Sequence, residues 1–587
     1  MVNFYFLIRR YNYKKMVKLI NEVLPLKYEE KINILPYIFM VFILSSYIYV
    51  LLYKNKWLAI IIAGCFFIIL IFKVKLKISM ILIAFFIVPL INNFHYNNIF
   101  ISNKEEVRII SINSYGAIGE IAKRKVYMNG NIKNVKLGEK FIIKGEFTRD
   151  VNREKGIIGE FKVEGIEKLD RDLKERIYKL REYIFSRLKE KLGYRRAAIV
   201  TSIAFGYTEF LDRDDKEDMK SLGILHAISV SGLHMVLVYS ILKRIFGEKV
   251  APIISAVYVI FSGAALSTIR AYIMMVCMNF SLPLRRNYNP IAALSMSGII
   301  LMIFKPYSIF EVGFQLSFLA TLGIIIFNKS INKRLYKFPK FFREGISICL
   351  SSQIFTFPVL VCYFKEFSFG FLLGNLILVP LMNIVVILGN LLALVINFEM
   401  IFNYIAFLAY YITMFIDIGT KWLLNITPNP IYLNELINIS YIIILITIYF
   451  YKEGYKKALY FPTVIIMYFY MLIYSPLPKI EYFKEGIIAV SFRGERAICA
   501  LKKDVDLEKF KVITLSKNTY KDFNNIKINK NFNIEKNNKD IILKGRDNSY
   551  LIKLSKGKNS SNYDIIDFKS ENYGKIILID NKALVFN

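Results

Sequence analysis

Hydrophobic residues occur along this chain in long uncharged runs that short lysine-rich segments separate. The first three runs are Leu35–Tyr53, Trp57–Phe72 and Ile78–Asn92, and the linkers between them carry only lysine as a charged residue. Each run approaches the roughly 20 apolar residues that a helix needs to cross a bilayer. The pattern therefore predicts three membrane-spanning helices in this part of the chain.

A second group of uncharged runs fills most of residues 223–477. Glycines and prolines interrupt these runs, which predicts helices that are broken within the membrane. Backbone groups at a break must be buried in protein or face water, so we expect broken helices around a polar path. The runs are 251–269, 271–284, 290–304, 312–327, 346–364, 367–398, 401–415, 436–451 and 459–474.

Two regions outside these runs show other patterns. Residues 96–170 contain short β-branched stretches separated by Gly, Asn and Asp, which predict a small antiparallel barrel or sandwich. An OB-like barrel fits the length, and so does any other five-stranded meander. Residues 170–192 repeat apolar residues three and four apart among charged ones, which predicts an amphipathic helix against the membrane surface or the barrel.

Residues 478–587 also predict strands, and we expect a small β-rich domain there. The Asn- and Lys-rich stretch 527–540 is typical of a loop or of disorder. The strand-like stretches are 487–492, 512–517, 541–545, 550–555 and 575–586.

Together these patterns predict a polytopic α-helical membrane protein with a small N-terminal OB-like β-barrel domain outside and a small β-rich C-terminal region. The basic segment before the first helix places the N-terminus in the cytoplasm by the positive-inside rule, and three crossings then put the barrel outside. In chain order we expect a basic N-terminus with three helices, the barrel domain, an amphipathic helix with an acidic linker, the main transmembrane domain and the β-rich region. These parts span residues 1–95, 96–170, 171–220, 221–477 and 478–587.

Composition supports the membrane assignment. Hydrophobic residues make up 55% of the chain and the mean hydropathy is +0.41, above the values of ordinary soluble domains. The net charge of +33 is typical of nucleic-acid binding, but lysines that solvate loops or touch anionic lipid explain it equally well. The five cysteines show no CxxC spacing, so neither a disulfide framework nor a zinc site is indicated.

The most informative polar residues lie in one apolar stretch at the start of the main transmembrane domain. In a bilayer such groups are costly unless they face a neighbouring helix or a water-filled cavity. Two histidines eight residues apart turn by roughly 80 degrees on a straight helix, so they do not form an i, i+4 metal pair. A helix break between them would let both converge on one cavity, whereas bonds to neighbouring backbone carbonyls would make them packing residues. The set is His226, Ser229, Ser231, Gly232 and His234.

Other polar residues in apolar surroundings are single. Arg270 must pair or reach water, and its guanidinium suits phosphate binding, with snorkelling to the interface as the alternative. Glu311 is a candidate countercharge for Arg270. We expect Gln315 and Asn375 to hydrogen-bond between helices.

An acidic patch precedes the main transmembrane domain. We expect a solvated helix start there rather than a site for a hard cation. The sequence indicates no metal site, no cofactor and no catalytic residue, and nothing in it resembles a phosphate-binding P-loop. The patch consists of Asp212, Asp214, Asp215, Glu217 and Asp218.

Several blocks of the sequence resemble the ComEC competence family, the inner-membrane channel for transforming DNA. The blocks are HAISVSGLHMVL, STIRAYIM, KPYSIFEVGFQLSFLATLGI, and FTFPVLVCYF followed by LLGNLILVPL, and they occur in the family's order. The resemblance covers about residues 30–475. It places His226, Ser229, Ser231, Gly232 and His234 at a central helix break, with Arg270, Gln315, Asn375 and Pro380 in neighbouring blocks.

The resemblance implies that a single DNA strand passes through the membrane body while its complement is degraded outside. Many family members end in a metallo-β-lactamase-like domain with an HxHxDH cluster, whereas residues 478–587 contain no histidine. That region is either a degenerate remnant or an unrelated domain, and we expect no metal-dependent nuclease in it.

The expected function is therefore a non-enzymatic channel for single-stranded DNA in the cell membrane. Its expected partners are membrane lipids, a DNA receptor, a separate nuclease and a cytoplasmic translocation ATPase. Two alternatives stay open: a transporter of another anionic solute, and a membrane-embedded hydrolase that uses His226 or His234 with the acidic patch.

Overall fold

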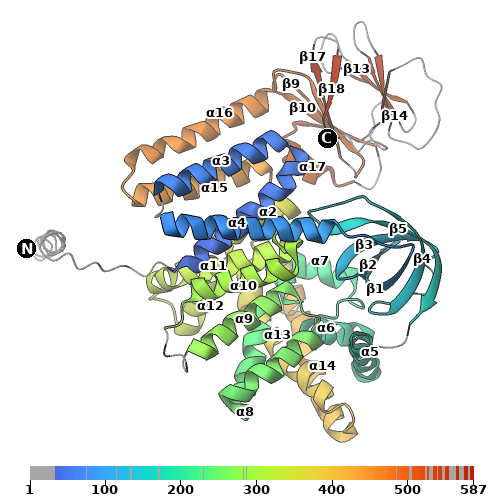
Figure 1. Cartoon of the computed structure of the whole chain (residues 1–587), viewed down its shortest axis with the longest axis vertical. Coiled ribbons are helices and arrows are strands. Elements are labelled where there is room, and N and C mark those ends of the chain that lie inside the picture. The colour runs from blue at the N-terminus through green and yellow to red at the C-terminus, as the bar shows by residue number, and fades with distance from the viewer. Residues whose placement is uncertain are drawn as a thin grey trace, which may run out of the picture. The chain divides into compact units, whose positions relative to one another are not determined.

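The computed structural model of the chain describes residues 33–587 apart from short gaps. Its residues divide into two compact units (Figure 1), one formed by residues up to 99 with 287–306, and the other by residues 100–286 with 307–587. The gaps are residues 74–75, 114–115, 133–134, 170–171, 229–230, 282, 284, 286, 484, 502–504, 522–524, 528–532, 538–539, 545–548, 554–563, 568–573, 580–581 and 587.

The first unit is a group of four apolar helices. The hydroxyl of Ser45 on α2 donates to the carbonyl of Phe86 on α4, at 2.6 Å, and so ties these two helices together. Gly298 on α10 lies where a larger residue would overlap the ring of Phe39 on α2. The fourth helix therefore packs with the first three, from which about 190 residues separate it in the sequence. The helices are α2 (Ile34–Lys54), α3 (Lys56–Lys73), α4 (Leu76–Asn97) and α10 (Pro290–Phe304).

The second unit begins with a closed five-stranded barrel in the order β1-β2-β3-β5-β4, in which β4 pairs back onto β1. All neighbouring strands are antiparallel except β3 and β5, which run parallel. Alternate residues point inward, and Val107, Val126 and Phe161 are fully buried in the barrel core. The strands are β1 (Lys104–Asn113), β2 (Gly116–Ile121), β3 (Arg124–Gly130), β4 (Lys140–Thr148) and β5 (Ile157–Lys168).

Helix α5 (Leu173–Leu192) follows the barrel and is the amphipathic helix that the sequence predicts. Asp172 caps it by accepting a hydrogen bond from the backbone of Glu175, at 3.0 Å. The guanidinium of Arg108 on β1 also binds Asp172, and this bond holds the pKa of the carboxyl at about 2. The cap of α5 is thereby attached to the barrel wall.

The buried face of α5 packs against the helical body. Ile184 and Leu188 join a hydrophobic core that also contains residues of α6 (Tyr194–Phe205), α13 (Phe371–Leu394) and α14 (Glu399–Ile426). Gly389 of α13 lets its backbone approach α6, because a side chain there would meet Ala204. Arg181 of α5 is buried too, and its guanidinium donates to the carbonyl of Phe261 at the end of another helix.

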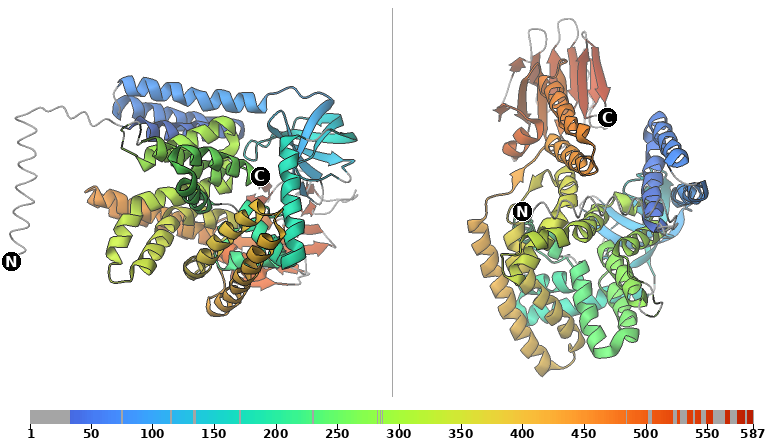
Figure 2. Two further views of the ribbon diagram at one scale, coloured as in Figure 1. Left: turned by 90° about the horizontal axis from the view of Figure 1, so that it is seen from below. Right: turned by 90° about the vertical axis from the view of Figure 1, so that its left-hand side faces the viewer.

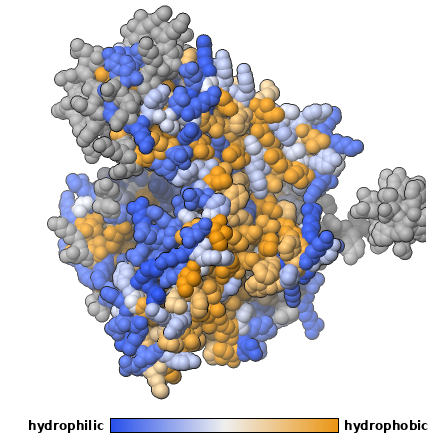
Figure 3. Space-filling model, turned by 180° about the vertical axis from the view of Figure 1, so that it is seen from behind, coloured by the Kyte–Doolittle hydropathy of each residue, from blue (hydrophilic) through white to orange (hydrophobic). Residues whose placement is uncertain are grey.

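The rest of the helical body contains most of the candidate membrane helices. Nine helices in the described part of the chain are long and apolar enough to cross a membrane by length and composition. Hydrophobic side chains form a broad band over the helices on the face shown in Figure 3, with hydrophilic residues at its borders. These features agree with a polytopic membrane protein. The remaining helices are α7 (Arg213–Ser221), η1 (Leu225–Ala227), α8 (Gly232–Phe261), α9 (Leu266–Ser281), η2 (Pro306–Phe310), α11 (Val312–Arg334), α12 (Lys340–Phe364), α15 (Glu435–Lys452), η3 (Lys456–Tyr460) and α16 (Phe461–Tyr474).

The apolar run 251–269 does not form one helix, contrary to the sequence prediction. The run is divided between the end of α8 and the start of α9 by a turn in which Gly263 and Ala264 both have positive φ. Gly247 also has non-helical angles, φ 78° and ψ 175°, so α8 consists of two short helices joined at a sharp bend. Three consecutive helices of 14 to 16 residues result, each short of the length that crosses a bilayer.

The C-terminal region contains two β-sheets that pack face to face (Figure 2) and share one hydrophobic core. One sheet has the order β11-β10-β9-β8-β17-β18 and the other β12-β13-β14-β15-β16. The strands are β8 (Lys479–Phe483), β9 (Ile487–Phe492), β10 (Glu495–Ala500), β11 (Asn518–Tyr520), β12 (Asn525–Lys527), β13 (Asn533–Asn537), β14 (Asp540–Lys544), β15 (Ser549–Lys553), β16 (Asp564–Asp567), β17 (Lys575–Ile579) and β18 (Lys582–Phe586).

Two sequence predictions for this region were wrong. The stretch 512–517 was expected to be a strand, but its first residues finish helix α17 (Leu507–Thr514), which Asp506 caps through the backbone of Lys509. The cap and the contact of Phe510 with the sheet outweigh the β-propensity of Val512 and Ile513. Part of the expected loop 527–540 is strand β13, whose Ile534 is buried between the sheets.

We expect Asp172→Asn to loosen the attachment of α5 to the barrel. Because the pKa of Asp172 is about 2 in the folded protein and 3.8 ordinarily, its contribution to stability is complete above about pH 4 and is lost as the pH falls through 2. The side chain is 39% exposed, so solvent screening reduces this contribution to about 1 kcal/mol. Amide hydrogen exchange in α5 should be about fivefold faster in the variant at pH 7 and equal to the unsubstituted protein near pH 2.

The matched control is Glu190→Gln, which removes an exposed ion pair with Arg187 on the same helix. This change should leave the exchange rates of α5 unaltered. Equal exchange in Asp172→Asn and the unsubstituted protein at pH 7 would contradict the role of the Arg108–Asp172 ion pair.

Candidate functional site at the broken helices

The polar stretch at the start of the transmembrane body forms a break between two helical segments. Gly223 has a φ of +67° and lies against Phe371 of α13, where a side chain would collide with the backbone. The chain then makes the single turn η1 and starts α8 at Gly232, with Ser231 as the N-cap. Ser229 lies outside the described residues. The predicted break at Ser231–Gly232 is therefore confirmed as a helix start.

His226 lies in this break. Its side chain is exposed to solvent. The imidazole interacts with the backbone of Gly223 and with the side chain of Asn375 on α13. Asn375 also donates to the carbonyl of Phe371, at 2.7 Å, which fixes the amide toward the break. Two of the predicted site residues, from segments 149 positions apart, thus meet here.

His234 has a different role, because its side chain is only 1% exposed. Its Nδ1 accepts a hydrogen bond from the backbone N–H of Ser231, at 3.3 Å. This is the half of a capping box in which the third helical residue binds the N-cap backbone, with histidine in place of the usual Glu or Gln. The packing alternative therefore describes His234, whereas His226 is exposed and contacts Gly223 and Asn375.

Arg270 lies in the second turn of α9 and is buried, with 8% of its surface exposed. Its Nε donates to the hydroxyl of Ser317 on α11, at 2.8 Å, and its guanidinium lies 5.9 Å from the ring centre of Phe318. A Cβ on Gly232 would come within 2.8 Å of Nη2, so the guanidinium lies directly beside the first turn of α8. Burial in this position is inconsistent with snorkelling to the membrane surface.

The expected pairing of Arg270 with Glu311 was wrong. Glu311 binds Lys125 of the barrel instead, with 2.8 Å between Oε1 and Nζ. Glu311 lies six residues, nearly two helical turns, before Ser317, so it precedes the part of α11 that contacts Arg270. The charge of Arg270 is thus not neutralised by the acid that the sequence suggested.

The two remaining predicted residues contact other parts of the body. Gln315 donates from Nε2 to the carbonyl of Ile309, at 2.9 Å, and so braces the turn between η2 and α11. Pro380 lies within α13, which continues through it to Leu394. Ser317, which the sequence analysis did not select, accepts a hydrogen bond from Arg270 and lies in the block FQLSF that carried the family resemblance.

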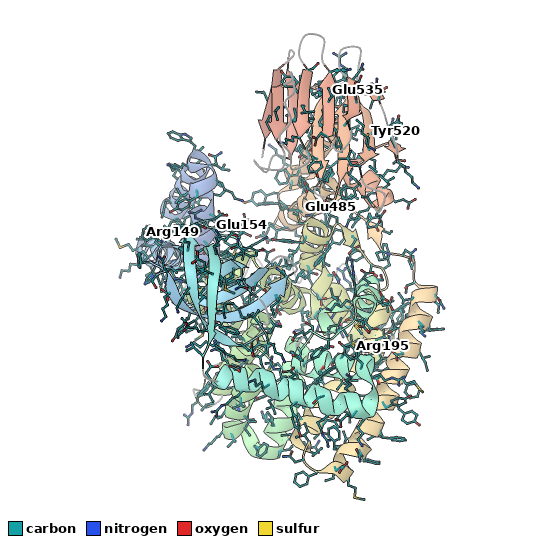
Figure 4. All side chains as sticks on the ribbon, turned by 90° about the vertical axis from the view of Figure 1, so that its right-hand side faces the viewer. Arg149, Glu154, Arg195, Glu485, Tyr520 and Glu535 are labelled. Atoms are coloured by element: carbon teal, nitrogen blue, oxygen red, sulfur yellow. The ribbon has the colours of Figure 1, made fainter. Side chains whose placement is uncertain are left out.

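The acidic patch is not merely a solvated helix start. Arg195 of α6, labelled in Figure 4, binds Asp215 with both ends of its guanidinium, at 2.6 Å from Nη2 and 3.1 Å from Nε. Asp417 of α14 lies 3.2 Å from the same Nη2. The hydrogen bonds to Asp215 raise the pKa of Arg195, which favours the charged pair. Among the described residues, no group of three or more His, Cys, Asp or Glu could hold a metal ion.

Comparisons with known proteins fall on the same segment. Residues 203–453 match the model of the competence protein family. The chain is 25% identical over 227 residues to ComE operon protein 3 of Bacillus subtilis (strain 168), a match that covers 37% of the chain and 29% of that protein. It is 29% identical over 154 residues to an uncharacterized protein of Aquifex aeolicus (strain VF5), which covers 25% of the chain and 37% of that protein.

Residues 203–453, less than half of the chain, are thus similar to competence proteins of the ComEC type. The match spans about a third of the length of the curated relatives. No solved structure matches the chain. The resemblance that the sequence blocks indicated is therefore confirmed, and it rests on the segment that contains the broken helices.

Within the segment that matches the competence protein model, the sequence blocks meet in space. The block HAISVSGLHMVL supplies His226 and Gly232, STIRAYIM supplies Arg270, the FQLSF block supplies Ser317 and LLGNLILVPL supplies Asn375. Four of the five blocks thus contribute a residue to the break or to the contacts of the guanidinium beside it.

The capping role of His234 can be tested by substitution. His234→Gln keeps an acceptor that suits the capping box and should leave the melting temperature nearly unchanged, whereas His234→Ala should lower stability by about 1 kcal/mol. Thermal unfolding of both variants in detergent checks this. Equal melting temperatures for the two variants would show that the bond to Ser231 does not stabilise the helix start.

Proposed function

We propose that this protein is a non-enzymatic channel that conducts single-stranded DNA through the cell membrane during natural competence. The arrangement of Arg270 at the start of α8 supports this most directly. A helix N-terminus carries a partial positive charge from its unpaired N–H groups, and a guanidinium beside it adds a full charge. Two positive groups at one point in an apolar body favour an anion, and the DNA backbone provides one phosphate per nucleotide.

The solvent exposure of His226 supports a wet path beside this point. A polyanion crosses a membrane only where water or polar groups replace its hydration. Three consecutive short helices end near the break, as expected of a transport path built from discontinuous helices. His226 and Asn375 offer hydrogen-bonding groups that carry no fixed negative charge, so they do not repel phosphate.

We infer that the barrel is an OB-like domain outside the membrane. The closed order β1-β2-β3-β5-β4 with parallel β3 and β5 supports the OB-like assignment. The positive-inside rule supports the external orientation, because lysines and arginines lie far along α8 and α11 from the contact with the barrel. Lys243, Arg244 and Lys249 flank the bend of α8, and basic residues surround the loop after α11.

The channel requires partners for the steps that it does not perform. With no histidine in residues 478–587, degradation of the second strand is assigned to a separate nuclease. A cytoplasmic ATPase supplies the energy for translocation, since the sequence contains no P-loop, and a DNA receptor delivers the substrate. Membrane lipids surround the helical body.

The decisive experiment is uptake of labelled DNA by a deletion strain complemented with this gene. Arg270→Ala should lower transformation by at least about tenfold while the protein stays in the membrane, because a charge-assisted bond to phosphate is lost. Arg244→Ala, which removes an exposed arginine of α8, is the matched control. Unchanged uptake in Arg270→Ala removes this residue from the path, and uptake of another anion with no DNA uptake favours a different transporter.

Gly232→Ala tests the same site without removing a charge. The added methyl group would displace the tip of the Arg270 side chain, which is flexible, so the melting temperature should change little while DNA uptake falls. Gly313→Ala adds a methyl group to open space and serves as the control. Equal uptake in both glycine variants would contradict a role for the contact.

A further inference from the structure

The barrel contacts the transmembrane body through the outer face of β3. Lys125 on this face extends to Glu311, with 2.8 Å between Nζ and Oε1, and its ammonium lies 4.3 Å from the ring centre of Tyr307 in η2. Both side chains of the ion pair are partly exposed, Lys125 by 24% and Glu311 by 33%. Water and dissolved ions therefore reach the pair.

The loop between β4 and β5 contacts the same point. Gly156 in this loop has a φ of +68°, and its backbone lies so close to the ring of Tyr307 that a Cβ would overlap it. The loop also carries Arg149, Arg153 and Lys155, and Figure 4 shows Arg149 at the edge of the barrel. The loop also carries Asp150 and Glu154, so an anion that approaches the contact between barrel and body meets a small excess of cationic side chains.

Glu311 also belongs to the helix that holds Arg270. It is the N-cap residue of α11, and its side chain makes no cap hydrogen bond because the carboxylate extends to Lys125. Ser317, which binds the guanidinium of Arg270, lies six residues further on, about 9 Å along the helix. The ion pair therefore fixes the start of α11 at a short distance from the candidate phosphate site.

The barrel is linked to Arg270 through a second helix as well. Helix α5 continues from β5, and its Arg181 donates to the carbonyl of Phe261 at the end of α8. Gly263 lies against this guanidinium, and α9 starts three residues later. The barrel and α5 thus contact the outer ends of both helices that position Arg270.

We propose that the Lys125–Glu311 ion pair is a latch that a phosphodiester backbone opens. Lys125 is a compact point charge, and a phosphate that binds it competes with the carboxylate of Glu311 for the same ammonium. Release of Glu311 frees the N-terminus of α11 and with it the support of Ser317 for Arg270. The latch rests on the proposed function for the source of the anion, and it couples the arrival of a strand at the barrel to the site in the membrane.

The test measures binding of a fluorescent 12-residue oligothymidylate to the full-length protein in nanodiscs by anisotropy. Glu311→Gln removes the competitor of the phosphate, so affinity at low salt should rise about fivefold, the equivalent of one partly exposed ion pair. Lys125→Gln should weaken binding. The double variant should show no gain from Glu311→Gln, because the gain requires the lysine.

Glu167→Gln is the matched control, since it removes a carboxylate from another Lys–Glu pair of the barrel, with Lys144. This variant should change affinity by less than about twofold. A gain in Glu311→Gln no larger than in Glu167→Gln, or a gain that persists without Lys125, overturns the latch.

Hydrogen exchange separates the latch from the proposed function. In the unsubstituted protein the oligothymidylate should increase amide exchange in the first turns of α11, and Glu311→Gln should show the increased exchange without ligand. Binding without either change contradicts the latch alone. Absence of oligothymidylate binding in both the unsubstituted protein and Glu311→Gln contradicts the latch and the proposed function together.

Discussion

The burial of one guanidinium within the helical body determines how the surrounding helices can be arranged. Removing a guanidinium from water is costly unless polar groups surround it, so α9 is held where Ser317 of α11 and the start of α8 lie within reach of Arg270. Gly232 is compatible with this position because it has no side chain. The chain reverses direction at the bend at Gly247 and again at the turn at Gly263–Ala264. These two reversals bring Arg270 of α9 back to the start of α8 at Gly232.

Arginines also attach both extramembrane domains to the ends of membrane helices. Arg181 of α5 donates to the carbonyl of Phe261 at the end of α8, and Arg496 of β10 donates to the carbonyl of Leu472 near the end of α16. The last carbonyls of a helix lack backbone partners and carry a partial negative charge, so a guanidinium there satisfies them and stabilises the helix end. In both cases the guanidinium binds a backbone carbonyl and not a carboxylate. Burial disfavours the charged form and therefore lowers the pKa of each arginine.

The sequence predicted the class of structure and the position of the break better than the contacts within the site. Hydropathy averages over many residues, so it located the apolar runs but could not detect the turn at Gly263–Ala264, which depends on two backbone angles. Gly232 and His226 stood out because polar residues are rare in such runs. Their partners could not be predicted, because Ser317 and Asn375 come close only when helices distant in sequence pack together.

The number of helices between contacts relates the C-terminal sheets to the barrel. The chain leaves η2, which contacts the barrel at Lys125, as α11 and returns as α12, which leads into β6 (Glu366–Phe367). Helices α13 and α14 make a second round trip that ends at β7 (Ile431–Tyr432). Strand β7 pairs with β6, so both round trips end at the same place. A third round trip by α15 and α16 leads into the sheets, and the hydroxyl of Tyr432 binds Asp506 of that region, at 2.5 Å. The even number of helices and the bond between Tyr432 and Asp506 agree, so we infer that the barrel and the sheets lie on one side of the membrane.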